Sequence, residues 1–199
     1  MKKILLICAF CTFSTLAKAD CNLGDFLFLD GSCSNDLQTN KNPVGIVVDA
    51  ERNIALSIEQ SEQQWTINGP HLEISSNKGL AQTPQDALEE FDGQELAPYF
   101  DAIAPNFYKA MNYCASMDYV NARSWFLPEL GLLNLIYQQK ENINNKLSKL
   151  EKPQLLQNSW YWSGSQYSYT QSWLESFFDG SIAYQNNDTN QLTRCVINF

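Results

Sequence analysis

Short runs of aromatic and β-branched residues fill the C-terminal end of the chain, from Trp160 to Phe199, and predict three or four strands. Asp179-Gly180 separates two of these runs, and this dipeptide is a strong local signal for a tight hairpin. Two polar stretches, Gln166–Gln171 and Asn186–Asn190, lie between the predicted strands. They are rich in Tyr, Ser, Asn and Gln, the residue types that antibody loops use for binding. We therefore expect these two stretches to be loops that contact a ligand.

The N-terminal part of the chain predicts further strands. Residues 26–29, Phe-Leu-Phe-Leu, precede Asp30-Gly31 and predict a strand that runs into a turn. Residues 44–49 have the pattern of a buried strand, and residues 54–58 are its expected hairpin partner. The following stretch, residues 60–101, is weakly patterned, so we expect long loops with a short helical turn.

Helices are predicted in the middle of the chain, where apolar residues recur at steps of three and four. The first spans Pro105 to Met117. The second begins at Pro128, a residue suited to the first helical position. The third spans Lys140 to Leu150 and ends before Pro153, which cannot continue a helix.

The first residues have the pattern of an export signal. Lys2 and Lys3 precede an apolar run, Ile4–Leu16, that is too short to span a membrane. Ala17-Lys18-Ala19 gives the small-x-small pattern of a cleavage site, so the mature chain is expected to begin at Asp20. A membrane anchor and a lipoprotein are the alternatives, but Asp20 stands where a lipoprotein needs a small residue. We expect an exported protein of the periplasm or cell surface, with no membrane insertion after signal removal.

The composition is that of a folded, acidic domain. The 199 residues are 44% hydrophobic and carry a formal net charge of −9, which becomes about −12 once three lysines leave with the signal. Such a charge repels phosphate backbones, so nucleic acid is excluded as an expected partner. A basic protein surface or a cationic ligand is better matched, although acidity also serves solubility alone. The oligomeric state is left open.

Cysteines indicate disulfides. Cys8 and Cys11 leave with the signal, and the remaining four allow three connectivities. We favour Cys21–Cys33, which closes a short hairpin, and Cys114–Cys195, which ties the middle helix to the last strand. The spacing does not fit a zinc site.

The sequence offers little for catalysis. It has no Gly-x-Ser-x-Gly elbow, phosphate loop or dinucleotide fingerprint, and His71 is its only histidine. Glu129, Glu175 and Asp179 are candidates for the carboxylate pair of a glycosidase. Each also has a structural explanation, as a charge at a helix N-terminus, an outward strand residue and a turn residue. We therefore predict no catalytic residues and no cofactor.

A calcium site is a further alternative. Asn186, Asn187, Asp188 and Asn190 form a local cluster of oxygen atoms, and calcium needs several such ligands. Runs of Asn and Asp between strands are more often turn chemistry, so we predict no metal.

Several motifs in fixed order resemble a bacterial C-type-lectin-like domain. They are Tyr113-Cys114, Trp125-Phe126-Leu127-Pro128, residues 161–165, the stretch from Ser172-Trp173 to Asp179-Gly180, and residues 194–199. The nearest resemblance is to the Lcl C-terminal-domain family, which is related in pattern to the variable proteins of diversity-generating retroelements.

The resemblance implies an α+β, C-type-lectin-like fold with two main helices packed on a twisted, mostly antiparallel sheet. Residues 105–199 would be its core, preceded by a loop-rich insertion over 61–104 and a small N-terminal β-hairpin region over 20–60. It also implies that Cys114 pairs with Cys195. The chain lacks the Glu-Pro-Asn, Gln-Pro-Asp and Trp-Asn-Asp motifs of calcium-dependent lectins, so calcium-mediated sugar binding is not implied.

In such folds the late strands and loops bind the ligand, and Tyr rings beside Asn and Gln suit both sugar stacking and protein recognition. The expected ligand-binding residues are Gln166, Tyr167, Tyr169, Gln171, Tyr184, Asn186, Asn187, Asp188 and Asn190. We expect an exported, non-enzymatic recognition module of the adhesin type that binds a protein or glycan. The alternatives are an envelope polysaccharide hydrolase and a structural subunit of a surface fibre, which an exposed apolar edge or patch would favour.

Overall fold

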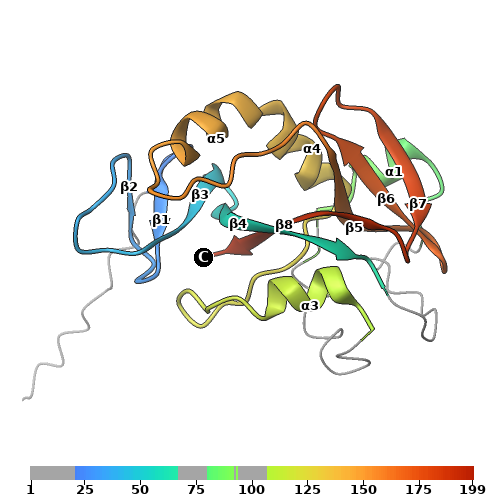
Figure 1. Ribbon diagram of the computed structural model, residues 1–199, viewed down its shortest axis with the longest axis horizontal. Coiled ribbons are helices and arrows are strands. Elements are labelled where there is room, and N and C mark those ends of the chain that lie inside the picture. The colour runs from blue at the N-terminus through green and yellow to red at the C-terminus, as the bar shows by residue number, and fades with distance from the viewer. Residues whose placement is uncertain (1–20, 67–79, 92, 94–106) are drawn as a thin grey trace, which may run out of the picture.

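An eight-stranded sheet runs through the computed structural model, which describes residues 21–66, 80–91, 93 and 107–199 (Figure 1). The strands are β1 (Phe26–Phe28), β2 (Cys33–Ser34), β3 (Pro43–Asp49), β4 (Ile54–Gln64), β5 (Trp160–Ser168), β6 (Gln171–Ser176), β7 (Ile182–Asn186) and β8 (Asn190–Asn198). Their order in the sheet is β2-β1-β3-β4-β8-β5-β6-β7. Neighbouring strands are antiparallel except β5 and β8, which are parallel.

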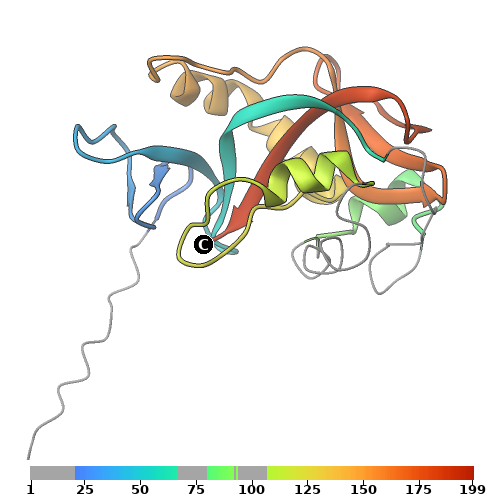
Figure 2. The same cartoon turned by 60° about the horizontal axis from the view of Figure 1, so that its bottom comes forward.

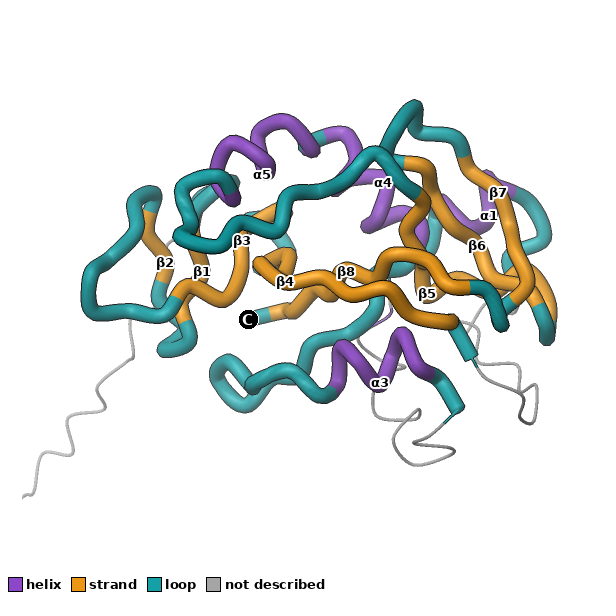
Figure 3. The backbone as a smooth tube through the Cα atoms, in the orientation of Figure 1, coloured by secondary structure: helices purple, strands orange, loops and turns teal. Residues whose placement is uncertain are grey.

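Helices cover both faces of this sheet. The described helices are α1 (Pro84–Leu88), α3 (Lys109–Ala115), α4 (Leu130–Gln138) and α5 (Lys140–Leu147). In Figure 1, α4 and α5 lie above the sheet and α3 lies below it, and Figure 3 shows the same layers by element type. One hydrophobic cluster joins the sheet to α4 and α5, and the other joins it to α3 and contains Trp125 and Trp162. The sheet is therefore the middle layer and buries apolar side chains on both faces.

Both hairpins expected from short-range signals are present. β3 pairs with β4, and Asn53 in their turn has a φ of 54°, a conformation that Asn tolerates better than most residues. β6 pairs with β7 across Asp179-Gly180, where Gly180 has a φ of 77°. A Cβ at Gly180 would lie 2.6 Å from the ring of Tyr137, so glycine is required there by conformation and by space.

The longest pairing joins two strands that are more than a hundred residues apart in the sequence. β4 and β8 run side by side from Ile54 opposite Asn198 to Gln64 opposite Asn190 (Figure 2). The register shifts between Leu56 and Gln60, where β4 bulges. This pairing fixes the N-terminal strands beside the C-terminal ones.

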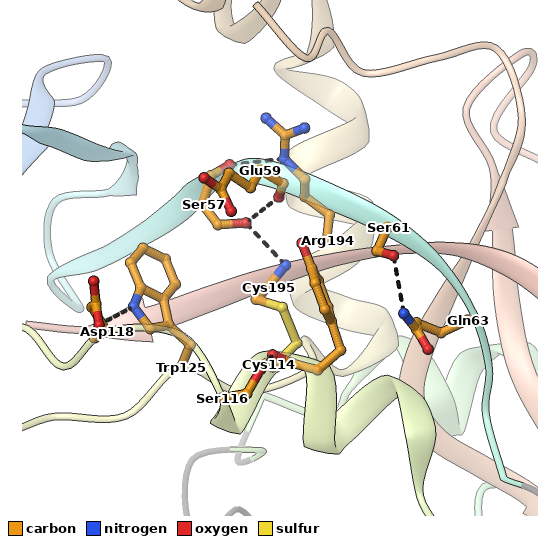
Figure 4. Close-up of a disulfide and its surroundings, with 11 residues drawn as sticks. Ser57, Glu59, Ser61, Gln63, Cys114, Ser116, Asp118, Trp125, Arg194 and Cys195 are labelled. Carbon is orange, nitrogen blue, oxygen red and sulfur yellow. Dashed lines mark hydrogen bonds between the residues drawn. A yellow bond between two sulfur atoms is a disulfide. The ribbon is translucent and has the colours of Figure 1, made fainter.

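Polar groups at the bulge are satisfied by β8 (Figure 4). The Nε of Arg194 donates to the carbonyl of Ser57 at 2.8 Å, and the backbone N–H of Cys195 donates to the Ser57 hydroxyl at 3.2 Å. The Ser57 hydroxyl in turn donates to the carbonyl of Glu59 at 2.7 Å. The guanidinium also donates to the carbonyl of Gln154 at 2.8 Å. Burial lowers the pKa of Arg194 to about 10, so the side chain is still charged at neutral pH.

The favoured disulfides are confirmed. Cys21 pairs with Cys33 and Cys114 pairs with Cys195, and the two Cα atoms are 5.4 Å apart in each case. The second disulfide joins α3 to β8, as the sequence predicted (Figure 4).

The expected C-type-lectin-like α+β fold is wrong. Strands β1–β4 are not a separate N-terminal hairpin region, because they form half of a continuous mixed sheet. Gln60–Gln64 is polar and belongs to the stretch, residues 60–101, that the sequence predicts to form loops, yet β4 continues to Gln64 by pairing with β8. Pairing between segments more than a hundred residues apart leaves no local pattern in the sequence.

Other expectations have mixed outcomes. The short helical turn in the weakly patterned region is confirmed as α1, which Thr83 caps. The second and third predicted helices are present as α4 and α5, and the described part of the first is α3. The export signal, His71 and most of the expected insertion lie outside the described residues. Within the described residues, no helix has the length and apolar character needed to cross a bilayer.

Removing the long-range disulfide should destabilise the protein more than removing the short one. On the loop-entropy account, losing a closure of 81 residues (Cys114→Ala with Cys195→Ala) costs about 4 kcal/mol of unfolding free energy. The matched control, Cys21→Ala with Cys33→Ala, opens a closure of 12 residues and should cost about 3 kcal/mol. Urea unfolding curves of both variants measure the difference, and a larger loss for the control would contradict this account.

Candidate binding surface

The residues expected to bind a ligand lie mainly in strands, not in loops. β5 extends through Ser168 and β6 begins at Gln171, so only Tyr169 and Thr170 connect them. β7 extends to Asn186 and β8 begins at Asn190, which leaves a three-residue turn. The prediction of two polar loops was therefore wrong in extent, because the strands continue through residues that local composition assigned to turns.

Three aromatic side chains from β5, β6 and β7 pack together. The rings of Tyr167 and Tyr184 stack with centroids 3.9 Å apart and planes 2° apart. Both rings meet Trp173 edge to face, at 5.4 Å and 5.5 Å. Trp173 is buried and donates its indole N–H to the carbonyl of Ala81 at 2.8 Å. We call Tyr167, Trp173 and Tyr184 the aromatic cluster.

The aromatic cluster is exposed on one side only. Tyr184 is 45% exposed, whereas Trp173 is 2% exposed and Tyr167 is half-buried. A hydrogen bond with the Tyr184 hydroxyl raises the pKa of Tyr167, so Tyr167 is neutral at physiological pH. Tyr169, in the turn after β5, is 51% exposed. Of the predicted tyrosines, Tyr169 and Tyr184 are thus accessible to a partner, and Tyr167 mainly supports Tyr184.

The predicted polar residues divide into buried and exposed ones. Gln166 and Asn187 are buried, at 1% and 2% exposure, and do not face solvent. Asn186, Asp188 and Asn190 are exposed, and Gln171 is half-buried. Because the side chain of Asn187 is buried while those of its neighbours are exposed, the four oxygen-bearing side chains do not share one environment. Among the described residues, no three His, Cys, Asp or Glu side chains are grouped so that they could hold a metal ion.

The three candidate carboxylates have different surroundings. Glu129 is buried and lines a cavity of about 20 Å³ beside Gly93 and Gly164. Glu175 is buried on β6 and accepts a hydrogen bond from the Asn134 amide at 2.8 Å. Asp179 lies exposed in the β6–β7 turn, where its carboxylate accepts from the backbone N–H of Ser181 at 3.1 Å.

Glu175 is an unusual carboxyl group. Its second oxygen has no hydrogen-bonding partner in the described part of the chain. Burial raises the pKa of Glu175 to about 7, and the hydrogen bond from Asn134 opposes this effect. In the folded protein the carboxyl group of Glu175 therefore changes between its protonated and ionised forms near neutral pH.

Sequence reasoning missed two hollows that form between distant segments. One is a groove of about 320 Å³ between α5 and the start of the sheet. Its lining mixes apolar residues with three amide residues and two lysines, namely Leu23, Ile46, Val47, Ile143, Gln139, Asn142, Asn145, Lys146 and Lys149. We call it the α5 groove. The other is a cleft of about 310 Å³ beside Trp125, lined also by Glu59 and Asp118. No local signal identifies either one, because each is assembled from elements far apart in the sequence.

Exposed apolar side chains occur singly around the strands at both ends of the sheet order. Nine large hydrophobic side chains of the described residues are exposed, and six of these belong to the two ends. The six are Leu23, Leu29 and Leu37 around β1 and β2, and Tyr169, Phe178 and Tyr184 around β6 and β7. Figure 1 shows these two groups of strands at opposite ends of the long axis.

Comparisons with known proteins find similarity of structure only. No family model matches the sequence, and no curated protein matches it significantly. The structure is similar to the crystal structure of a fimbrial protein from Bacteroides ovatus ATCC 8483, with a TM-score of 0.67 and 15% sequence identity. The match covers 89% of this chain and 49% of that protein, so the chain spans about half of its length. This likeness concerns the fold, and it agrees with a mixed sheet rather than with the lectin-like fold expected from the sequence.

Glu175 should make stability depend on pH. Its pKa rises from 4.5 to about 7 on folding, so between these values the unfolded chain loses the proton first and the folded state loses relative stability as pH rises. Glu175→Gln should remove this loss, and its unfolding free energy relative to wild type should increase by about 3 kcal/mol between about pH 4 and about pH 8. Urea unfolding curves of both proteins at several pH values measure this difference in unfolding free energy. Glu141→Gln, at an exposed position on α5, is the control. Parallel profiles for wild type and Glu175→Gln would contradict the assignment.

Proposed function

We propose that this protein is an exported structural subunit of a surface fibre. The similarity of its fold to a fimbrial protein supports this proposal. At 15% sequence identity this likeness concerns the fold alone, so features of this chain that suit assembly are needed as well.

The observation that carries the proposal is that exposed apolar side chains and sheet edges occur at both ends of the sheet. A contact between two different ends of neighbouring copies is head-to-tail, and such a contact builds an open filament when the rotation between copies does not close a ring. A fibre subunit needs this arrangement, whereas a closed dimer needs one patch that pairs with itself.

The sheet edges are consistent with this proposal. β7 has one neighbour in the sheet, β6, and its side chains from Tyr184 to Asn186 are exposed. β2 forms the other edge, but with two residues it is a short edge that offers little for pairing, so β7 is the edge that suits assembly. Exposed edges are sites where further chains can pair, and proteins that remain monomeric usually protect them.

Two disulfides support export, because such bonds form and persist in oxidising compartments outside the cytosol. The net charge of −9 keeps single subunits soluble before assembly.

Assembly on cells tests the proposed function. An epitope-tagged full-length chain expressed in its own organism should be recovered from the cell surface in particles far larger than a monomer. Immunogold electron microscopy should place the tag along filaments. A protein that is recovered quantitatively as a monomer, with no labelled filaments, would refute the proposal.

A second candidate function is recognition of a glycan or protein by the same subunit. The specific observation is the aromatic cluster with Tyr169 beside it, since exposed rings on a rigid support suit both kinds of contact. The two functions are compatible, because fibre subunits can also carry binding surfaces.

Tyr169→Ala tests recognition separately from assembly. On a glycan array and on a panel of surface proteins, the variant should lose about tenfold or more of any affinity the wild type shows. Its melting temperature should stay unchanged, because the side chain is 51% exposed. Tyr119→Ala, 61% exposed in the loop after α3, is the matched control. Full binding by Tyr169→Ala would exclude Tyr169 from the contact.

A further inference from the structure

The cleft beside Trp125 combines apolar walls with two carboxylates. Its volume is about 310 Å³, and it lies between β4, the start of β3 and the end of α3 with the segment that follows. Its apolar lining includes Val44, Ile58, Met117 and the rings of Tyr113 and Trp125. Glu59 and Asp118 also line the cleft and are exposed, so the acidic groups lie at its open side. We call it the Trp125 cleft.

The bulge of β4 places Glu59 at this cleft. Leu56 is opposite Val196 and Gln60 is opposite Arg194, so the residues between them on β4 face Cys195 alone. Bulges change the direction of side chains and are frequent beside functional sites. Here the Ser57 hydroxyl donates to the backbone carbonyl of Glu59 at 2.7 Å, which fixes the backbone that carries the carboxylate.

The other walls of the cleft are fixed as well. The indole N–H of Trp125 donates to the backbone carbonyl of Asp118 at 2.8 Å. The Cys114–Cys195 disulfide holds α3, which carries Tyr113, against β8. In the view of Figure 4, the Trp125 ring lies between the side chains of Asp118 and Glu59. A site whose walls are held before binding loses little conformational freedom when it is occupied.

The two carboxylates are not paired with cations of this chain. Among the residues that the structure describes, neither Glu59 nor Asp118 forms an ion pair. Arg194 is within electrostatic reach of Glu59, but its guanidinium donates to neutral oxygen atoms of β4 and of Gln154. Burial raises the pKa of Tyr113 and the charge of Glu59 raises it further, so the phenol beside Glu59 is neutral. The cleft thus has negative charge to offer to a ligand.

This lining suits a cation carried on a carbon chain. Carboxylates form strong, charge-assisted hydrogen bonds with ammonium groups, and aromatic rings also attract cations. The alkyl stem of a lysine packs on apolar surface while its charged end reaches polar groups. A calcium ion fits less well, because it takes about six or more oxygen ligands and most of this lining is carbon. The net charge of −9 attracts cations towards the protein in general.

We propose that the Trp125 cleft binds a lysine side chain of another polypeptide. The alkyl stem would pack against Ile58, Met117 and Trp125, and the ammonium group would bind the carboxylates of Glu59 and Asp118. Because both acidic residues are exposed, the cleft is open on their side and leaves room for the backbone that carries the lysine. The cleft involves neither β7 nor the aromatic cluster, so this inference does not depend on the proposed fibre function.

Methyl NMR of the methionines tests the site in the purified protein with both disulfides formed. After removal of the signal the chain contains Met111 and Met117, and only Met117 lines the cleft. N-acetyl-lysine methylamide should shift the Met117 methyl signal to saturation and leave that of Met111 unchanged. N-acetyl-norleucine methylamide, which has an alkyl stem without the ammonium group, should bind at least about tenfold more weakly. Met117→Leu assigns the signals.

Charge-removing variants identify the groups that bind the ammonium. Glu59→Gln and Asp118→Asn should each weaken binding of N-acetyl-lysine methylamide about tenfold, because each replaces a charged acceptor by a neutral one. Glu62→Gln and Asp36→Asn change exposed carboxylates outside the cleft and should bind as the wild type does. Melting temperatures show whether each variant folds. Asp118→Asn gives a result that is independent of Arg194, which lies near Glu59.

The outcomes support or overturn the site without reference to filaments. Saturable binding of N-acetyl-lysine methylamide that is weakened in both acidic variants supports the proposal. An unshifted Met117 signal, equal binding of the norleucine compound, or acidic variants that bind like the controls would overturn it. Pentane-1,5-diamine is the third probe, since it presents the same ammonium group on a free molecule. If the diamine binds and N-acetyl-lysine methylamide does not, the assignment to a polypeptide is wrong.

Discussion

The pairing of β8 with β4 is the contact on which the rest of the sheet depends. β8 lies between β4 and β5, so it alone connects β2-β1-β3-β4 with β5-β6-β7. Successive side chains of a strand point to opposite faces of the sheet, so the side chains of Arg194 and Cys195 lie on different faces. Arg194 reaches the segment that follows α5, through Gln154, and Cys195 is joined to α3. One dipeptide thus attaches both covering layers to the central strand.

The buried guanidinium and the bulge of β4 require each other. Removing a charge from water costs several kcal/mol, and Arg194 is 1% exposed. Its hydrogen-bond acceptors are neutral: the carbonyls of Ser57 and Gln154 and the amide oxygen of Gln60. The bulge leaves polar backbone groups that regular pairing would have satisfied, and the guanidinium satisfies the carbonyl of Ser57. One guanidinium nitrogen, Nη2, is buried without a hydrogen-bonding partner among the described residues, so the arrangement is weak evidence for net stability.

The sequence predicts those parts of the fold that depend on residues close together in the chain. It does not predict the parts that depend on pairing between distant residues. The β3–β4 and β6–β7 hairpins and the helices α4 and α5 depend on residues close together in the chain, and local patterns located them. The two disulfides were identified from cysteine number and position. The extension of β4 to Gln64 depends on a strand more than a hundred residues away, and its Ser- and Gln-rich sequence resembles a loop. The mistaken lectin-like fold has the same origin, because the motifs behind it describe local elements and not their order in a sheet.

The sequence identified only part of the candidate binding surface, because the burial of a side chain also depends on distant residues. Composition identified the aromatic and amide residues near β5–β7, but it could not tell that Asn187 and Gln166 face inward. The burial of each depends on strand register, which is a property of the assembled sheet. The α5 groove could not be found at all, since residues before β1 and on β3 meet α5 only in the folded protein.

Association between copies of this chain depends more on the charges at the contact than on the net charge of the chain. Copies of a chain with a net charge of −9 repel each other at long range, but at physiological ionic strength this repulsion is screened beyond about 8 Å. At contact distance the local charges decide. Residues 160–193 contain no lysine or arginine, but Lys140 at the start of α5 donates to the carbonyl of Phe177 within this stretch. A basic side chain of α5 therefore lies beside the β6–β7 turn, and a contact made there depends on this local charge rather than on the net charge of −9.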